Sequence, residues 1–103
     1  MAKYALSQMA LADLSNIWEY TYEEWSQMQA DKYYTLLINT CQKLADKPSI
    51  GKAYKQIADD IFGYRIKKHI IFYHTISKKS TTTVEIIRIL HESMDLRNQL
   101  AEG

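Results

Sequence analysis

The residues best suited to chemistry lie in the second half of the chain, within apolar segments. Arg65 stands in the stretch GYRIKK, and Arg88 and His91 stand in the stretch IIRILH. Cleavage of RNA through its 2′-hydroxyl requires a base, an acid and a cation around one phosphate. These three side chains could supply two of those roles, and a Glu or Lys whose position the sequence does not fix would have to supply the third. The sequence is thus compatible with an RNA-cleaving site.

Structural roles for the same residues are the simpler interpretation. A histidine that closes a strand, as His91 would, is more often a hydrogen-bonded structural residue than a catalyst. An arginine inside an apolar strand needs a carboxylate partner, because a buried unpaired charge is very costly. For Arg88 the sequence offers Asp95, Glu92 or Glu24 as that partner. We therefore expect Arg88 and His91 to fix the end of a sheet.

The sequence indicates no cofactor or metal. It lacks a glycine-rich phosphate loop, so a nucleotide-binding P-loop is not expected. Cys41 and the three scattered histidines lack the spacing of a zinc site. Cys41 falls on the apolar face of a predicted helix, where a small buried thiol is ordinary.

The elements that must position these residues follow from periodicity and from helix signals. Alternation in Lys3 to Ser7 predicts a short strand, and Ser7 is a suitable N-cap for the helix that follows. The apolar stripe of this first helix includes Leu11, Leu14, Ile17, Trp18, Thr21 and Trp25. After a break near Ser26, a second helix runs to Pro48, which ends it.

The second half of the chain reads as a loop followed by strands. The segment PSIGKAYKQIADDIFG is predicted to be a loop with a short helical turn. The segments DIFGYRIKK, YRIKKHIIFYHTI and TTVEIIRILH are rich in β-branched and aromatic residues and predict strands, the last two paired as a hairpin. The last segment, ESMDLRNQLAEG, is a short helix or a tail.

Helices followed by strands predict an α+β fold, in which a helical hairpin packs on one face of a small antiparallel sheet. A chain of 103 residues is expected to form a single domain, residues 1–103. One cysteine rules out an internal disulfide and fits a reducing compartment. The start carries no secretory signal pattern, and no apolar run is long enough to span a bilayer. We expect a cytoplasmic protein without a membrane segment.

Charge is distributed unevenly along the chain. Residues 48–80 hold seven Lys or Arg against two Asp, whereas acidic residues are in excess on both sides, and the net charge is +1. A basic middle predicts a local positive surface. It does not predict a protein that coats nucleic acid, which would show a strong overall basic excess.

Several segments together resemble a known family. The stretch ALADLSNIWEYTYEEWSQMQADKYYTLLINTC resembles the helical hairpin of ParE toxins, in the ParE/RelE superfamily of bacterial type II toxin–antitoxin systems. It is followed by a P-x-x-G loop, then G-Y-R, then H-I-I-F-Y, and then R-I-L-H-x-x-M-D. Each motif is weak alone, but their order and spacing cover the chain from about Leu6 to Asp95.

The resemblance implies a function as well as a fold. ParE-like toxins poison DNA gyrase, and a ParD-like antitoxin holds them inactive by folding its C-terminal segment onto the toxin in a hetero-oligomer. Such a toxin is not an enzyme and does not recognise nucleic acid specifically. The RelE-like branch instead cuts messenger RNA on the ribosome, and this is the alternative. For that alternative only Arg65 and His91 stand at suitable catalytic positions, and the basic excess expected for ribosome binding is missing.

Two sets of contact residues follow as hypotheses. The segment from Glu92 to Leu100 and the basic stretch from Arg65 to Lys68 are expected to contact the target, through Arg65, Lys67, Lys68, Met94, Asp95, Leu96 and Arg97. Aromatic residues of the helical hairpin are expected to contact the antitoxin, namely Trp18, Tyr22, Trp25 and Tyr33.

Overall fold

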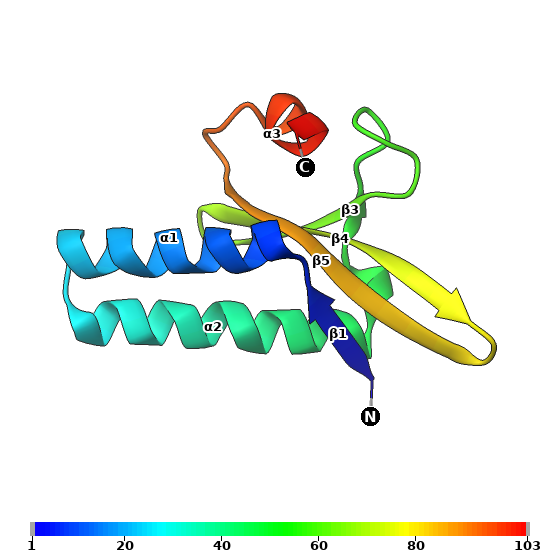
Figure 1. The fold of residues 1–103 in the computed structure, drawn as a ribbon, viewed down its shortest axis with the longest axis horizontal. Coiled ribbons are helices and arrows are strands. Elements are labelled where there is room, and N and C mark those ends of the chain that lie inside the picture. The colour runs from blue at the N-terminus through cyan, green and yellow to red at the C-terminus, as the bar shows by residue number, and fades with distance from the viewer. Residues whose placement is uncertain (1, 103) are drawn as a thin grey trace.

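A five-stranded sheet carries a helical hairpin on one face and a short C-terminal helix on the other (Figure 1). The computed structural model describes the backbone of residues 2–102 and, within that range, every side chain except those of residues 97, 101 and 102. Its elements in chain order are β1 Lys3–Leu6, α1 Gln8–Glu24, α2 Gln27–Asp46, the 3-10 turn η1 Pro48–Ile50, β2 Lys52–Ala53, β3 Phe62–Ile66, β4 His69–Lys78, β5 Thr81–His91 and α3 Leu96–Glu102. The predicted α+β fold is confirmed.

Serine caps begin both long helices, as the sequence predicted for the first. The Ser7 side chain accepts a hydrogen bond from the backbone N–H of Ala10 (3.0 Å), and Ser26 accepts one from Gln29 (3.1 Å). Replacing such a cap with alanine typically costs about 1 kcal/mol. The Ser7 hydroxyl also donates to the carbonyl oxygen of Ile87 in β5 at 2.7 Å. The start of α1 is thereby attached to the sheet.

The sheet is mixed, which differs from the predicted antiparallel sheet at one edge. Its strand order is β1-β5-β4-β3-β2, and β2 to β5 are antiparallel neighbours, but β1 runs parallel to β5 with Tyr4 opposite Val84. No tight turn connects β1 to its neighbour, because both helices and three strands intervene. Hairpin geometry therefore does not set its direction. The two-residue strand β2 lies within the segment predicted as a loop.

The core has two layers, one on each face of the sheet. The layer under the hairpin contains Leu14, Leu37, Cys41, Leu44, Tyr73 and Ile86, all at most 1% exposed. The layer on the other face consists of Ile70, Phe72 and Leu90, against which Leu96 and Leu100 of α3 pack. The C-terminal segment is therefore a helix that covers part of the core.

The predicted apolar stripe of the first helix is only partly buried. Leu14 is 1% exposed, whereas Leu11 is 49% and Trp25 is 75% exposed. Figure 1 shows the reason for the exposure of Trp25, because the far end of the α1–α2 hairpin, where Trp25 follows α1, extends beyond the sheet. Residues near that end, including Trp25, have no strand beneath them.

Arg88 pairs with a carboxylate, but with none of the three that the sequence suggested. Its Nε and Nη2 donate to the two carboxylate oxygens of Asp13 at 2.8 and 3.0 Å, and its Nη1 donates to the carbonyl oxygen of Gln99 at 3.0 Å. The same Asp13 carboxylate accepts from the backbone N–H of Ile89 at 2.9 Å. Because Ser7 attaches the start of α1 to β5, Asp13 lies beside Arg88, and Asp95, Glu92 and Glu24 are displaced as partners. The predicted role of Arg88 at the end of the sheet remains.

Two features are absent from the part of the chain that the structure describes. Neither long helix contains an apolar stretch that is long enough to cross a membrane. No three side chains of the His, Cys, Asp or Glu type in that part of the chain stand close enough together to hold a metal ion.

Candidate functional site

A groove lies where the helical hairpin passes beyond the end of the sheet. Its first half is a cavity of about 740 Å³ lined by Tyr20, Thr21, Trp25, Gln29, Lys32, Tyr33, Leu36, Lys67, Lys68, His69 and His91. Its second half is a cavity of about 500 Å³ lined by Asp13, Asn16, Ile17, Tyr20, His69, Ile89, His91, Ser93 and Met94. Tyr20, His69 and His91 line both halves, so the two cavities adjoin. We call them the lysine half and the apolar half of the end groove.

Two histidines meet at the junction of these halves. His69 begins β4 and His91 ends β5, and the two residues are Cα partners in the antiparallel ladder. Their rings stand edge to face with centroids 5.3 Å apart. The pairing follows from the hairpin, because its first and last residues lie at the same end.

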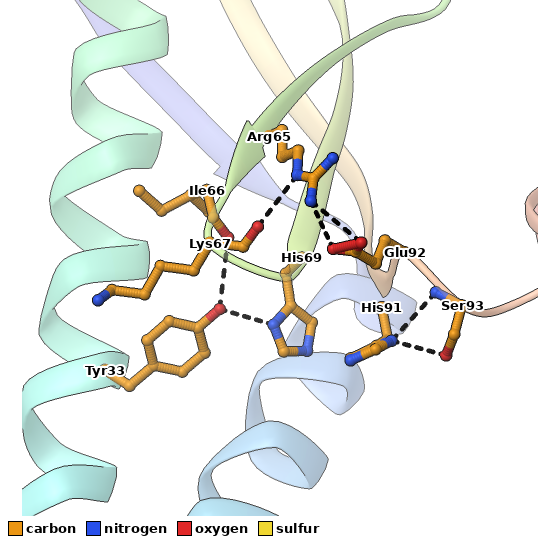
Figure 2. Close-up of polar contacts among 8 residues, drawn as sticks. All are labelled: Tyr33, Arg65, Ile66, Lys67, His69, His91, Glu92 and Ser93. Atoms are coloured by element: carbon orange, nitrogen blue, oxygen red, sulfur yellow. Dashed lines mark hydrogen bonds and ion pairs between the residues drawn. The ribbon is translucent and has the colours of Figure 1, made fainter.

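Tyr33 of α2 holds the His69 ring (Figure 2). Its hydroxyl lies 2.6 Å from Nδ1 of His69 and 3.5 Å from the carbonyl oxygen of Ile66, so Nδ1 is the better acceptor. Burial, and secondarily the neighbouring His91, lowers the pKa of His69 to about 4. Burial raises the pKa of Tyr33 to about 12. The pair is therefore neutral at physiological pH and serves to connect α2 with the sheet.

His91 is held by the turn that follows β5. Its Nδ1 lies 2.7 Å from the Ser93 hydroxyl and accepts from the backbone N–H of Ser93 at 3.1 Å. Since Nδ1 is an acceptor, the proton of the neutral ring sits on Nε2. His91 is thus hydrogen-bonded where β5 ends, and these bonds shape the chain just before Met94.

Arg65 points away from the histidines. It is the Cα partner of Ile70, whose side chain packs on the α3 side, whereas His91 is the partner of His69 on the hairpin side. Directly paired residues project from the same face of a sheet. Arg65 donates to both carboxylate oxygens of Glu92 at 3.0 and 2.7 Å (Figure 2). Arg65 and His91 therefore do not converge on one phosphate, and an RNA-cleaving site is not favoured.

Lysines give the lysine half its charge. Lys67 and Lys68 form the turn between β3 and β4, and Lys32 faces them from α2. Within the described residues none of the three takes part in an ion pair, and no carboxylate lines this half. The basic stretch that the sequence predicted thus becomes one wall of a groove.

The aromatic residues predicted to bind an antitoxin divide into two groups. Trp25 and Tyr33 line the lysine half. Trp18 and Tyr22 stack on each other with centroids 5.2 Å apart, and the Trp18 indole N–H donates to Asp31 at 3.0 Å. The stacked pair lies outside the end groove and braces α1 against α2.

The predicted target-contact residues after β5 also differ in environment. Met94 is 46% exposed and lines the apolar half. Asp95 precedes α3, and its carboxylate accepts from the backbone N–H of Asn98 at 3.4 Å and from the Asn98 side-chain amide at 2.9 Å, while Leu96 packs against the core. The side chain of Arg97 lies outside the described residues. Of the predicted residues after β5 whose side chains the structure describes, Met94 is the one that lines the groove.

Several groove residues were not among the contacts predicted from the sequence, and these include Tyr20, Lys32 and His69. A signal existed for His69, because it follows Lys67 and Lys68 directly and pairs with His91 if the hairpin is built around its central turn. Lys32 and Tyr20 had no such signal. Their place depends on how far the hairpin extends past the sheet.

Comparison with solved structures identifies chains that have the same fold. The chromosomal ParDE toxin–antitoxin system from P. aeruginosa matches with a TM-score of 0.73 over 88% of this chain and 96% of that chain, at 15% identity. The RelBE2 toxin–antitoxin complex from Mycobacterium tuberculosis matches with a TM-score of 0.65 over 87% and 96%, at 17% identity. At such low identity the likeness shows the fold alone, which is that of chains in toxin–antitoxin systems.

Sequence comparison then gives the family. The profile of the ParE toxin of type II toxin–antitoxin systems, parDE, matches residues 4–96. Toxin ParE1 of Caulobacter vibrioides is 36% identical over 103 residues, which cover 97% of this chain and 99% of that relative. Toxin ParE1 of Mycobacterium tuberculosis is 31% identical over 99 residues, covering 96% and 98%. The chain belongs to the ParE toxin family, and the resemblance drawn from its motifs is confirmed.

Proposed function

We propose that this toxin inhibits DNA gyrase in the cytoplasm, that it acts by binding rather than by catalysis, and that a ParD-like antitoxin neutralises it. The observation that carries the proposal is the family match over residues 4–96. The lack of convergence between Arg65 and His91 supports it, because an mRNA endoribonuclease would need such groups around one phosphate. The RelE-like alternative has no comparable support.

The target surface in this proposal comprises the β3–β4 turn and the chain that follows β5. Lys67 and Lys68 are exposed on the turn, and Met94 is exposed beyond β5. Arg65 holds these two segments together through Glu92, whose backbone N–H also donates to the carbonyl oxygen of Lys68 at 2.8 Å. In this surface Asp95 and Leu96 contribute by fixing the start of α3, and Arg97 remains a predicted contact.

The antitoxin surface in this proposal is the aromatic face of the hairpin. Trp25 is 75% and Tyr22 is 49% exposed. Tyr33 lines the lysine half together with Trp25, and Trp18 stacks on Tyr22. Exposed aromatic residues of this kind are frequent anchors at protein interfaces. The partner is inferred from the family, whose printed description names a toxin–antitoxin system.

Point variants test the target surface better than a truncation does. Removal of residues 96–103 would uncover Ile70, Phe72 and Leu90, so loss of toxicity could reflect unfolding. Lys67→Asn is preferable because Lys67 has a φ of 54°, which asparagine tolerates. Lys79 offers a matched control, since it has a φ of 56° in the turn at the opposite end of β4.

The experiment measures supercoiling by purified gyrase as a function of toxin concentration. We expect the Lys67→Asn/Lys68→Gln variant to need about tenfold more toxin for half inhibition, equivalent to about 1.4 kcal/mol. The Lys79→Asn variant should match the wild type. Equal inhibition by all three chains would remove the β3–β4 turn from the target surface.

A further inference from the structure

The second half of β4 has an open edge. β4 pairs with β5 along its whole length, but it pairs with β3 only from His69 to Tyr73. Residues 75–78 are exposed, and Figure 1 shows the ends of β4 and β5 projecting past the other strands. Among the described residues, no other backbone segment is hydrogen-bonded to this side of β4. An unpaired strand edge is a template for a further strand.

The register of the sheet determines which backbone groups face this open edge. Ile66 and His69 are Cα partners across the two-residue turn between β3 and β4, so the N–H and C=O of His69 face β3. The backbone groups of every second residue of a strand point to the same side. Counting from His69, the N–H and C=O groups of Thr75 and Ser77 therefore point outward from the open edge.

The side chains beside this edge form a charge gradient with an apolar centre. His74, Ile76 and Lys78 share the face of the sheet on which α3 packs. Ile76 is 38% exposed. At one end His74 Nε2 lies 2.5 Å from Glu85 Oε1, and its Nδ1 lies 4.0 Å from Asp60 Oδ2. At the other end Lys78 takes part in no ion pair within the part of the chain that the structure describes.

This pattern is complementary to itself. Thr75 and Ser77 lie one residue on either side of Ile76, so an antiparallel two-fold pairing centred on Ile76 sets Thr75 of one copy opposite Ser77 of the other. The two residues then exchange N–H···O=C bonds, and the two Ile76 side chains meet as a closely spaced, non-hydrogen-bonded pair. We propose that two copies of this chain associate through residues 74–78 of β4, which joins their sheets into one.

Charge favours a second copy over other occupants of the edge. In the two-fold pairing Lys78 of one copy stands opposite His74 of the other, beside the carboxylates of Asp60 and Glu85. A uniformly acidic or basic strand would meet like charge at one end of the edge. A nucleic acid strand would place phosphates against Asp60 and Glu85. A chain that is basic at one end and acidic at the other satisfies both ends, as the second copy does.

The pairing leaves the proposed target surface uncovered. The β3–β4 turn, with Lys67 and Lys68, lies at the opposite end of β4 from residues 74–78. The dimer would therefore carry two end grooves, one on each copy. An interface built around one short strand is small, so we expect a weak dimer with a dissociation constant of about 10–100 μM. The pairing does not depend on the proposed function.

Sedimentation velocity of the purified full chain, freed from antitoxin, tests the association. Across roughly 10–500 μM we expect the average mass to rise from that of a monomer towards that of a dimer by mass action. Ile76→Lys should weaken the dimer at least about tenfold, because two like charges then face each other across the two-fold axis. The control is Thr82→Lys, which adds the same charge at an exposed position of β5 in the same arm and should sediment as the wild type does. Thermal unfolding checks that each variant is folded.

Two further measurements test the register. Ile76→Cys should form a disulfide-linked dimer under mild oxidation, because Cα atoms of a non-hydrogen-bonded pair lie about 4.5 Å apart, within disulfide range. Thr82→Cys should remain monomeric, and the native thiol of Cys41 is buried. Amide exchange at Thr75 and Ser77 should slow as the protein concentration rises, because these N–H groups become hydrogen-bonded.

The inference is overturned if the wild-type chain stays monomeric at every concentration. It is also overturned if a dimer forms that Ile76→Lys does not weaken more than Thr82→Lys, or if the two cysteine variants crosslink equally. Failure of the proposed function is a separate result, since these measurements contain no gyrase. A monomeric chain that inhibits gyrase loses only the dimer, whereas a dimeric chain without inhibition loses only the proposed function.

Discussion

Two arginine–carboxylate pairs in this toxin have similar distances and very different surroundings. The side chains of Arg88 and Asp13 are 9% and 12% exposed, whereas those of Arg65 and Glu92 are 63% and 32% exposed. Solvent weakens the second pair, and removing one member leaves the other hydrated. Breaking the first pair leaves a buried charge without its partner.

The contrast predicts the stability of two matched variants. Asp13→Asn should lower the free energy of unfolding by about 3 kcal/mol, because Arg88 stays charged and buried. Glu92→Gln should lower it by less than about 1 kcal/mol. Urea denaturation measures both, and similar losses for the two variants would contradict this assignment of the buried pair.

The lowered pKa of His69 predicts how the free energy of unfolding depends on pH. Its pKa is lowered by burial from 6.5 to about 4, so between these pH values the unfolded chain binds more protons than the folded chain. This contribution is fully present above pH 6.5 and is lost as pH falls towards 4. Allowing for partial exposure, we expect a loss of roughly 1–2 kcal/mol.

A urea midpoint series between neutral and acidic pH tests this assignment. The groups facing His69 are Tyr33 and His91, with the charges of Asp13 and Glu92 acting in the opposite direction. His69→Asn should flatten the series over that range. An unchanged slope in the variant would assign the pH dependence to other groups.

At the scale of single residues, the sequence predicted what a residue does better than it predicted which residues it contacts. That Arg88 needs a carboxylate followed from its apolar strand, but Asp13 is 75 positions away in sequence and became the partner only through the attachment of α1 to β5. The role of His91 was predicted because it closes a strand. Its partner Ser93 is local, whereas its neighbour His69 requires the hairpin register.

At the scale of elements, local signals were sufficient and long-range pairings were not. Ser7, Ser26 and Pro48 delimit the two long helices by capping and backbone restriction, which depend on neighbouring residues alone. The direction of β1 and the existence of β2 depend on strands far along the chain. The length by which α1 extends past the sheet likewise depends on packing between segments that are distant in the chain.

Gly51 gives an element-scale prediction at the link between α2 and β2. A Cβ at this position would overlap the Tyr73 hydroxyl, which donates to the carbonyl oxygen of Pro48 at 2.5 Å. Gly51→Ala should therefore cost about 1–3 kcal/mol through overpacking, although the backbone, with a φ of −77°, would accept alanine.

A double variant distinguishes overlap with Tyr73 from any other effect of replacing Gly51. Tyr73→Phe removes the closest of the overlapping Tyr73 atoms, so Gly51→Ala should cost less in that background than in the wild type. Thermal or urea unfolding of the four chains gives the coupling. Strictly additive losses would show that the Tyr73 hydroxyl is not the obstacle.

At the scale of the whole molecule, function depends on which surfaces the fold leaves uncovered. The sequence predicted a basic stretch and an aromatic hairpin as separate contact surfaces. In the folded chain Lys67, Lys68, Trp25 and Tyr33 line one groove. Trp18 and Tyr22, which stack on each other, are not among the residues that line it. Such convergence depends on tertiary packing and has no local signal.

The measurement that tests the central claim most directly is a pair of assays on the purified wild-type chain. One follows supercoiling by DNA gyrase and the trapping of cleaved DNA, and the other follows translation with a readout of messenger cleavage. We predict loss of supercoiling with intact messenger. Cleaved messenger with normal supercoiling would contradict the proposed function and return Arg65 and His91 to consideration as catalytic residues.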